Sequence, residues 1–187
     1  MHLVSPSRDY LASYIDALER GWSPDNLRAA AVHEQLARIA VDADGFLASL
    51  GDRSASGMVT LPDGSQARRI PGYRRWMWDG EFCGTIGLRW QPGTEALPPH
   101  CLGHIGYTVV PWKRRRGYAT RALREILQDA KAEGLRYVEI TTGPDNLPSQ
   151  KVIEANGGVF VEEFTTPLSL GGHREYRYRV QLRTELV

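Results

Sequence analysis

The sequence predicts an α+β fold with a mixed, mostly antiparallel central sheet flanked by helices. Helical periodicity dominates residues 8–50, strand signals separated by tight turns fill residues 58–90, and strands and helices alternate from residue 103 onward. A chain of 187 residues with 42% apolar and 24% charged residues is long enough to bury a sizeable core. We therefore expect residues 1–187 to form a single domain.

Two helices are predicted near the N-terminus. Residues 8–20 place their apolar side chains on one helical face. A second helix is predicted from Ser23-Pro24-Asp25 to about Asp42, because a capping serine, a proline and an acidic residue favour a helical first turn. The periodicity of residues 45–50 fits neither a helix nor a strand clearly, so this segment is left unassigned.

The predicted strands fall into two groups. Residues 58–70 and 73–90 each form a hairpin, the second around Asp79-Gly80, a preferred pair for a two-residue turn. Near the C-terminus, residues 159–164 and 174–183 are strands, and the last of these alternates strictly between apolar and polar side chains. We expect this final strand to be half exposed, with an edge through which two copies can pair as a homodimer.

The most informative stretch runs from the strand Gly103–Val110 into a basic turn and a helix. Lys113 to Arg116 are four consecutive cations, and Gly117 precedes an amphipathic helix that is predicted to end at Gly134. A helix N-terminus presents unpaired N–H groups, and a glycine there lets a ligand approach the backbone. A solvated basic loop is the alternative interpretation. The strand before the turn and the regular helix after it favour a diphosphate site.

Two common nucleotide motifs are absent from this sequence. A P-loop needs Gly-Lys followed by Ser or Thr, and no such run occurs in the chain. A dinucleotide-binding turn needs three spaced glycines, whereas the turn before residue 118 contains one, Gly117. The predicted anion site is therefore of another kind.

The turn contains Arg114-x-x-Gly117-x-Ala119, preceded by Val109-Val110-Pro111. This pattern resembles the acetyl-CoA-binding motif of the GNAT superfamily of N-acetyltransferases, and residues 103–160 are similar to a bacterial subgroup of predicted acetyltransferases. The resemblance implies a GNAT-like fold in which residues 103–160 bind acetyl-CoA. It also implies that the N-terminal helices, residues 8–50, shape the acceptor side.

The resemblance assigns roles to individual residues. Backbone groups of Val109 and Val110 are expected to pair with the pantetheine arm, and Asn146 and Ser149 to lie along the same arm. The pyrophosphate is expected to bind at the turn, which comprises Arg114, Arg115, Arg116, Gly117, Tyr118, Ala119 and Thr120. Asn146 equally suits an ordinary role as a turn and helix-capping residue.

Acetyl transfer to a primary amine needs a group that removes a proton from the amine. The candidates we rank first are His104 and Glu95; the others are Glu81, His100 and Glu139, and a base acting through water stays open. The tyrosine that many GNAT enzymes use as general acid is replaced by Ile153. This replacement leaves a second function open, a non-catalytic acyl-CoA-binding or regulatory module.

Composition limits the expected partners. A formal net charge of +1 gives no indication of a nucleic-acid or membrane partner. Cys83 and Cys101 have the spacing of neither a metal site nor a disulfide framework, so no metal is expected. No apolar stretch is long enough for a membrane span or a signal sequence. We expect a cytoplasmic protein whose partners are acetyl-CoA and an amine acceptor, either a small molecule or a peptide.

Overall fold

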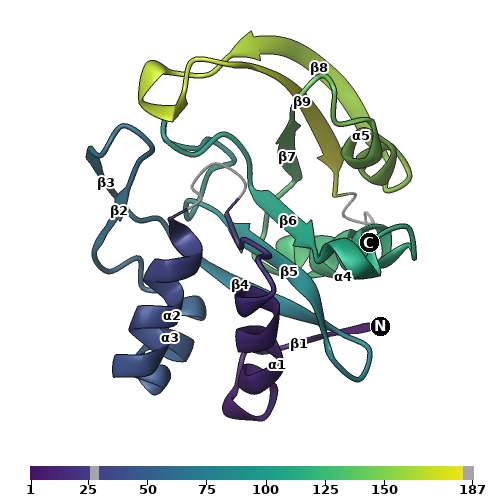
Figure 1. Ribbon diagram of the computed structural model, residues 1–187. Coiled ribbons are helices and arrows are strands. Elements are labelled where there is room, and N and C mark those ends of the chain that lie inside the picture. The colour runs from purple at the N-terminus through teal and green to yellow at the C-terminus, as the bar shows by residue number, and fades with distance from the viewer. Residues whose placement is uncertain (26–29, 183–187) are drawn as a thin grey trace.

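The computed structural model describes residues 1–25 and 30–182 and consists of two main antiparallel sheets with helices around them (Figure 1). Its elements in chain order are β1 (His2–Val4), α1 (Arg8–Glu19), α2 (Ala31–Val41), α3 (Ala43–Leu50), β2 (Met58–Thr60), β3 (Gln66–Arg68), β4 (Gly72–Trp78), β5 (Phe82–Arg89), β6 (Ile105–Val109), a 3-10 turn (Pro111–Lys113), α4 (Tyr118–Ala132), β7 (Tyr137–Thr142), α5 (Leu147–Glu154), β8 (Gly158–Thr165), a second 3-10 turn (Leu168–Leu170) and β9 (Arg174–Gln181). Over the described ranges, none of the helices is both long enough and apolar enough to cross a membrane.

The strands are distributed over two sheets and a small hairpin. The first sheet has the order β1-β4-β5-β6, the second has the order β7-β9-β8, and β2 pairs with β3 alone. Figure 1 shows the second sheet with α5 at the top, the first sheet at the centre, α1 to α3 at the lower left and α4 at the right. The predicted α+β class and both predicted hairpins are confirmed.

The two sheets are joined where β6 begins. The N–H of His104 donates to the carbonyl of Glu139 (2.7 Å), and the N–H of Glu139 donates to Nδ1 of His104 (2.9 Å). Gly103 permits this approach, because a side chain there would lie 3.0 Å from the Glu139 carbonyl oxygen. Past this junction β6 is an edge of the first sheet and β7 an edge of the second, so the sheets diverge.

The side chain of Glu139 ties the junction to the central strand of the second sheet. Arg177 and Arg179 on β9 donate to its two carboxylate oxygens at 2.8 and 2.6 Å. Burial alone raises the pKa of Glu139, but the hydrogen bonds from Arg179 and Arg177 outweigh it and hold the pKa below its ordinary value. The carboxylate therefore stays ionised in the folded protein.

Two hydrophobic cores lie on opposite faces of the first sheet. On one face, α4 buries the predicted stripe, which comprises Ala122, Leu123, Ile126, Leu127 and Ala130. On the other face, α1 and α3 cover an aromatic cluster in which Tyr14 stacks on Trp76 at 4.5 Å between ring centroids. Ridges of apolar side chains thus hold helices on both faces of the sheet.

The start of the second helix differs from the prediction. The hydroxyl of Ser23 accepts from the N–H of Asp25 (3.2 Å) in a local turn, and α2 begins at Ala31. A serine-proline-acid sequence serves a turn as well as a helix start, because the same side-chain oxygen satisfies the same kind of N–H. The predicted helical position Leu27 lies outside the described residues.

The unassigned residues 45–50 belong to α3. The carboxylate of Asp42 accepts from the N–H of Gly45 (2.9 Å) and caps this helix. The three-residue strand β1 was not predicted, because so short a segment carries no measurable periodicity.

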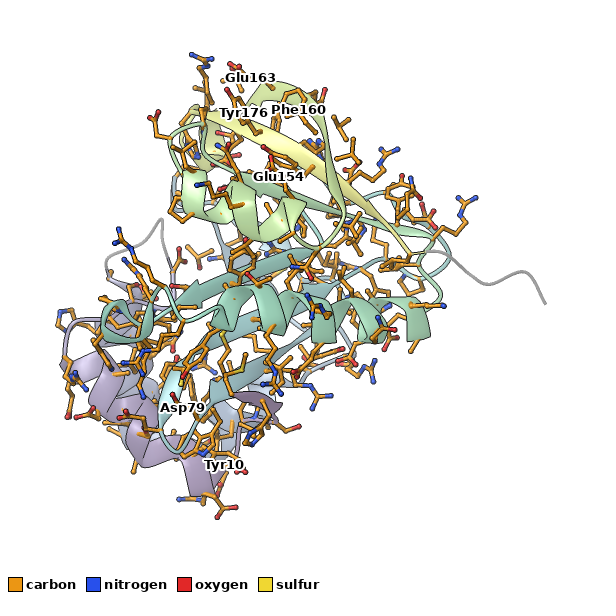
Figure 2. All side chains as sticks on the ribbon, turned by 90° about the vertical axis from the view of Figure 1, so that its right-hand side faces the viewer. Tyr10, Asp79, Glu154, Phe160, Glu163 and Tyr176 are labelled. Carbon is orange, nitrogen blue, oxygen red and sulfur yellow. The ribbon has the colours of Figure 1, made fainter. Side chains whose placement is uncertain are left out.

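The expectation of a free edge on the final strand was wrong. β9 lies between β7 and β8, so both of its edges are hydrogen-bonded. The predicted alternation holds, since Tyr178, Val180 and Leu182 are buried, while Arg183 lies outside the described residues. The edge strands of this sheet are β7 and β8. Phe160 on β8 lies edge-on to Tyr176 at 5.3 Å between ring centroids (Figure 2). Strand order depends on pairing across the fold, which alternation within one strand does not encode.

The junction makes a prediction for Glu139→Gln. A depressed glutamate pKa adds stability above the ordinary value of about 4.3, and this stability is lost as pH falls through the folded-state pKa. We expect the variant to melt about 5 °C lower at pH 7 and to lose less of its melting temperature between pH 5 and pH 3 than the wild type. Differential scanning fluorimetry across pH measures both effects.

Glu162→Gln is the matched control. It removes a partner from the same Arg177 (2.9 Å), but the side chain of Glu162 is 52% exposed, so a small change is expected. If Glu139→Gln melts at the same temperature as the wild type at pH 7, pH 5 and pH 3, the structural role of this carboxylate is contradicted.

Candidate functional site

The turn between β6 and α4 has the backbone geometry of an anion-binding concavity. Arg115 (φ +60°) and Gly117 (φ +71°) both take the left-handed conformation, two residues apart. Alternation between left-handed and other backbone conformations points successive N–H groups toward one centre. At Gly117 a side chain would meet no protein atom within 4 Å, so the space above its backbone is open.

The N–H groups of this turn are available to a ligand. In the hydrogen bonds among the described residues, none of the amides from Arg115 to Thr120 donates to another backbone group, and the first bonded amide is that of Arg121, which donates to Gly117 (3.0 Å). They form the N-terminal end of α4, a helix of 15 residues, where the macrodipole favours negative charge. This arrangement suits a phosphate or diphosphate group.

The cations at the turn divide into two sets. Arg114, Arg115 and Arg116 are exposed, and Arg114 Nε donates to the carbonyl of Val109 (3.1 Å). Lys113 is buried, and its Nζ lies 3.0 and 3.1 Å from the carboxylate oxygens of Asp79. The three arginines are therefore placed to attract an anion, while the lysine has a structural role.

Asp79 lies at the tip of the β4–β5 hairpin (Figure 2) and acts as a clamp, because it binds one residue on each side of the turn. It binds Lys113 before the turn and accepts from the hydroxyl of Tyr118 (2.6 Å) after it. Burial alone raises the pKa of Asp79, but hydrogen bonds from Tyr118 and Lys113 outweigh it and hold the pKa well below its ordinary range. From the sequence, Asp79 was only a turn residue, and no local pattern links it to a segment 34 positions later.

One edge of β6 is open to the gap between the sheets. The bonds from Arg89 N–H to the carbonyl of His104 and from Val110 N–H to that of Cys83, both 2.9 Å, show that even-numbered residues of this segment bond to β5. The backbone groups of Ile105, Tyr107 and Val109 therefore point the other way, into the gap.

Val110 does not fit its predicted role. Its N–H donates to Cys83 and its carbonyl accepts from Lys113 (3.0 Å), so both backbone groups are already bound within the protein. Tyr107 and Val109 hold the equivalent position on the open edge. Strand register, which decides the direction of each amide, was not visible in the sequence.

Tyr107 bridges the gap between β6 and α5. Its hydroxyl lies 2.8 Å from the hydroxyl of Ser149 and 3.3 Å from the carbonyl of the same residue. Burial raises the pKa of Tyr107 to about 12, so the phenol stays protonated and remains a hydrogen-bond donor. Asn146 caps α5 by accepting from the N–H of Ser149 (3.2 Å), and this was one of its two predicted roles.

Ile153 is part of the core. It is fully buried, and Gly158 packs so closely on it that a side chain at 158 would lie 2.3 Å from Ile153 Cγ2. The position at which the family resemblance leads one to expect a general acid therefore faces the interior here. Any donor to a leaving group has to come from another part of the chain.

His104 and Glu95 are neighbours, but neither presents a free basic atom. His104 is fully buried; its Nδ1 accepts from Glu139, so the ring proton lies on Nε2, which has no partner of good geometry in the described structure. The carboxylate of Glu139 and the nearby Glu95 backbone raise the pKa of His104. Burial outweighs them, so the pKa lies below its ordinary value.

The carboxylate of Glu95 binds the guanidinium of Arg136 through both oxygens at 2.9 Å and also accepts from its N–H at 3.1 Å. These hydrogen bonds lower the pKa of Glu95 to about 2, which makes it a weak base. Both residues therefore have evident structural functions.

The other candidate bases differ in how fully they are engaged. Glu81 pairs with Lys113, and Glu139 is held by two arginines. The ring Nε2 of His100 lies 3.0 Å from the carbonyl of Arg68, which can only accept, so Nε2 carries the proton and Nδ1 keeps its lone pair. His100 thus has the chemistry of a base.

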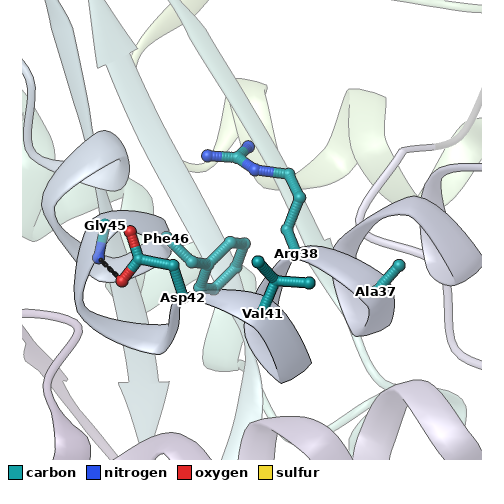
Figure 3. Close-up of a pocket in the computed structure, with 6 residues that line it drawn as sticks. All are labelled: Ala37, Arg38, Val41, Asp42, Gly45 and Phe46. Carbon is teal, nitrogen blue, oxygen red and sulfur yellow. Dashed lines mark hydrogen bonds between the residues drawn. The ribbon is translucent and has the colours of Figure 1, made fainter.

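A shallow pocket between α2 and α3 is separate from the turn (Figure 3). It is lined by Ala37, Arg38, Val41, Asp42, Gly45 and Phe46. Asp42 caps α3 and Arg38 lies over the ring of Phe46, so its polar groups are used within the protein. Within the described ranges, no group of three or more His, Cys, Asp or Glu side chains is arranged to hold a metal ion.

The divided sheet and the turn at the N-terminus of α4 suit a protein that binds a diphosphate-containing ligand, and comparison with known proteins identifies the family. A model described as an acetyltransferase (GNAT) domain matches residues 21–159, well over half of the chain. The chain belongs to the GNAT acetyltransferase family. No curated protein matches it in sequence.

Solved structures share the fold at low sequence identity. The microcin C7 self-immunity acetyltransferase MccE, in complex with acetyl-CoA and AMP, is 12% identical with a TM-score of 0.65, over 96% of this chain and 91% of that one. The ribosomal L7/L12 α-N-protein acetyltransferase RimL, in complex with CoA, is 14% identical with a TM-score of 0.63, over 96% and 92%. RimJ of Mycobacterium smegmatis, in complex with CoA-disulfide, is 21% identical with a TM-score of 0.62, over 96% and 80%.

The clamp makes a prediction for Asp79→Asn. The side chains of Lys113 and Asp79 are only 10% and 14% exposed, so loss of the charge leaves the ammonium poorly compensated. We expect a loss of about 2 kcal/mol in the free energy of unfolding, measured by urea denaturation. Glu81→Gln removes the more exposed partner of the same lysine and should cost less than half as much. Equal losses in the two variants would contradict the clamp.

Proposed function

We propose that this protein transfers the acetyl group of acetyl-CoA to a primary amine, by direct attack of the amine in a complex of both substrates. The observation that carries this proposal is the set of unused amides from Arg115 to Thr120, placed beside the open edge of β6. The diphosphate of CoA needs free N–H groups, and its amide-containing pantetheine arm needs an open strand edge beside them. The similar structures MccE and RimL hold acetyl-CoA and CoA.

In this proposal the chain binds CoA with three groups of residues. The diphosphate lies against the backbone of residues 115–120, with Arg114, Arg115 and Arg116 supplying positive charge. The pantetheine arm pairs with the open-edge backbone of Tyr107 and with the N–H of Val109, whose carbonyl already accepts from Arg114. Asn146 and Ser149, at the start of α5, border the same arm from the other side of the gap.

The leaving thiolate needs a hydrogen bond rather than a full proton transfer. A thiol has a pKa of about 8.5, so a phenol whose pKa is about 12 does not give up its proton to the thiolate. We place Tyr107, with Ser149 behind it, as the donor that stabilises the departing sulfur. A backbone N–H on the open edge of β6 stabilises the carbonyl oxygen during attack.

The amine must be neutral before it attacks. A free alkyl amine has a pKa of about 10.4, so a base must remove a proton near neutral pH. We assign this role to His100, because its Nδ1 keeps a lone pair while its Nε2 is anchored to Arg68. In this respect the proposal replaces His104 and Glu95, whose lone pairs are engaged elsewhere.

A non-catalytic acyl-CoA-binding module is the second candidate function. The burial of Ile153 supports it, because the position used for acid catalysis in many relatives holds no polar group. Release of free thiol from acetyl-CoA with a panel of small amines, amino acids, polyamines and peptides separates the two functions. Binding without turnover across the whole panel would favour the module.

Acetyl-CoA binding is tested with Gly117→Val. At a few tens of its Kd, acetyl-CoA should stabilise the wild type by about 2 kcal/mol. The valine fills the open space above the turn, so we expect the stabilisation to disappear in thermal-shift measurements. Gly134→Val is the control: Gly134 is also left-handed (φ +85°) with open space around it, but it lies at the other end of α4.

Both variants should melt lower because of backbone strain, and only Gly117→Val should lose the response to acetyl-CoA. An unchanged shift in Gly117→Val, or no shift in the wild type at millimolar acetyl-CoA, would overturn the proposed site.

The assigned roles are tested kinetically with Tyr107→Phe. Loss of the hydroxyl should lower kcat roughly tenfold to a hundredfold in the thiol-release assay, while the KM for acetyl-CoA changes little. His100→Gln should also lower kcat. Raising the pH toward the pKa of the free amine should restore the activity of His100→Gln but not that of Tyr107→Phe. Wild-type kcat in Tyr107→Phe would mean that the thiolate leaves unassisted.

A further inference from the structure

The face of the first sheet that carries α1 is covered at one end and bare at the other. Trp76 on β4 lies under Tyr14, within the aromatic core. Two residues earlier on the same face, Arg74 stands opposite Gly87 of β5, which in turn stands opposite Gly106 of β6. The sheet surface beside Arg74 is therefore backbone without side chains.

The two glycines keep this surface open. Gly106 is exposed although it lies within a paired strand, and a side chain there would lie 3.7 Å from the guanidinium of Arg89. A side chain at Gly87 would lie 3.4 Å from Cγ of Arg74. Both arginines thus border the bare surface next to β6, on which the proposed function places the thioester.

Arg74 stands among charged and polar side chains. Burial lowers its pKa, and so do the nearby charges of Arg89 and Arg69. Solvent nevertheless reaches the side chain, which is exposed. Tyr14 and Asp25 also face it, and both raise its pKa.

The guanidinium of Arg74 has no hydrogen-bond or ion-pair partner among the described residues. Its neighbour Arg75, on the opposite face of the strand, shows the usual alternative: it donates to the hydroxyl of Ser5 (2.5 Å) and lies 3.9 Å from the carboxylate of Asp129. Two further arginines repel it and the carboxylate of Asp25 attracts it, so the summed charge of these four side chains is positive and favours an anionic ligand. The planar fork of arginine matches a carboxylate or phosphate group with two parallel hydrogen bonds.

We infer that this bare surface over Gly87 and Gly106 is the acceptor site and that the acceptor is an anionic amine, whose carboxylate or phosphate binds Arg74 with Arg89 and Arg69 beside it. The inference rests on the proposed acetyl transfer. Neighbouring strands are about 4.8 Å apart, so the backbones of Arg74 and Gly106 are about 10 Å apart, with β5 between them. The amine and the anion therefore belong to one short molecule or to one chain end.

The kinetic test compares L-amino acids with their amides, in which the carboxylate is replaced by a neutral carboxamide. In the wild type, kcat/KM should fall roughly tenfold to a hundredfold on amidation. In Arg74→Gln the two forms should react alike, and Arg74→Lys should keep part of the preference. Arg75→Gln, on the other face, should discriminate as the wild type does. O-phosphoserine amide and phosphoethanolamine replace the carboxylate by a phosphate and show which anion is preferred.

A binding test decides the inference without turnover. With CoA saturating, inorganic phosphate at constant ionic strength should raise the melting temperature of the wild type and of Arg75→Gln. The concentration needed should rise at least tenfold in Arg74→Gln. The response of Arg74→Gln to acetyl-CoA should stay normal, which separates this site from the turn and shows that the variant is folded.

Equal rates for acids and amides in the wild type, or a phosphate response that Arg74→Gln leaves unchanged, would overturn the anion site while the transferase function stands. Absence of turnover with every amine would remove the transferase function, and the phosphate titration would still decide the anion site.

Discussion

The pair of hydrogen bonds between His104 and Glu139 is the constraint on which the rest of the structure depends. It joins β6 to β7 at the start of β6, so the strands separate beyond that point and the open-edge amides of β6 face a gap. The junction in turn depends on the negative charge of Glu139. Glu139 is partly buried and stays ionised only because Arg177 and Arg179 bind both of its oxygens. Part of the second sheet thus serves to keep the gap open.

Cations that are adjacent in the sequence have opposite functions in the fold. Lys113 is buried against Asp79 and holds the turn in place, whereas Arg114 to Arg116 remain exposed. Arg75 is paired, whereas Arg74 on the other face of β4 has no partner in the described part of the chain. An ion pair of a buried group stabilises a conformation, and an unpaired cation on an open surface attracts an anionic ligand.

The predictions that succeeded rest on local patterns. The stripe of α4, the hairpin around Asp79-Gly80 and the turn at Gly117 each depend on residues a few positions apart, and periodicity or turn chemistry records such relations. Other predictions concern residues whose partners lie far away in the sequence. His104 and Glu95 have typical catalytic side chains, but Glu139 and Arg136 engage their lone pairs across 35 and 41 positions. Val110 lost its assigned role through the register of β6 against β5.

The sequence by itself determined most of the elements from residue 58 onward, the glycine turn before α4 and the family, because each is recorded in contiguous residues. Tertiary structure alone decided the rest: the split between the sheets, the direction of each amide on β6, the pairing of Tyr107 with Ser149 and the isolation of Arg74. The physical reason is that hydrogen bonds and charges are satisfied by whatever group lies within about 3 Å in space, and separation along the chain does not determine that distance. The proposed donor site is therefore readable from its motif, whereas the proposed acceptor site emerges only when the strands are paired.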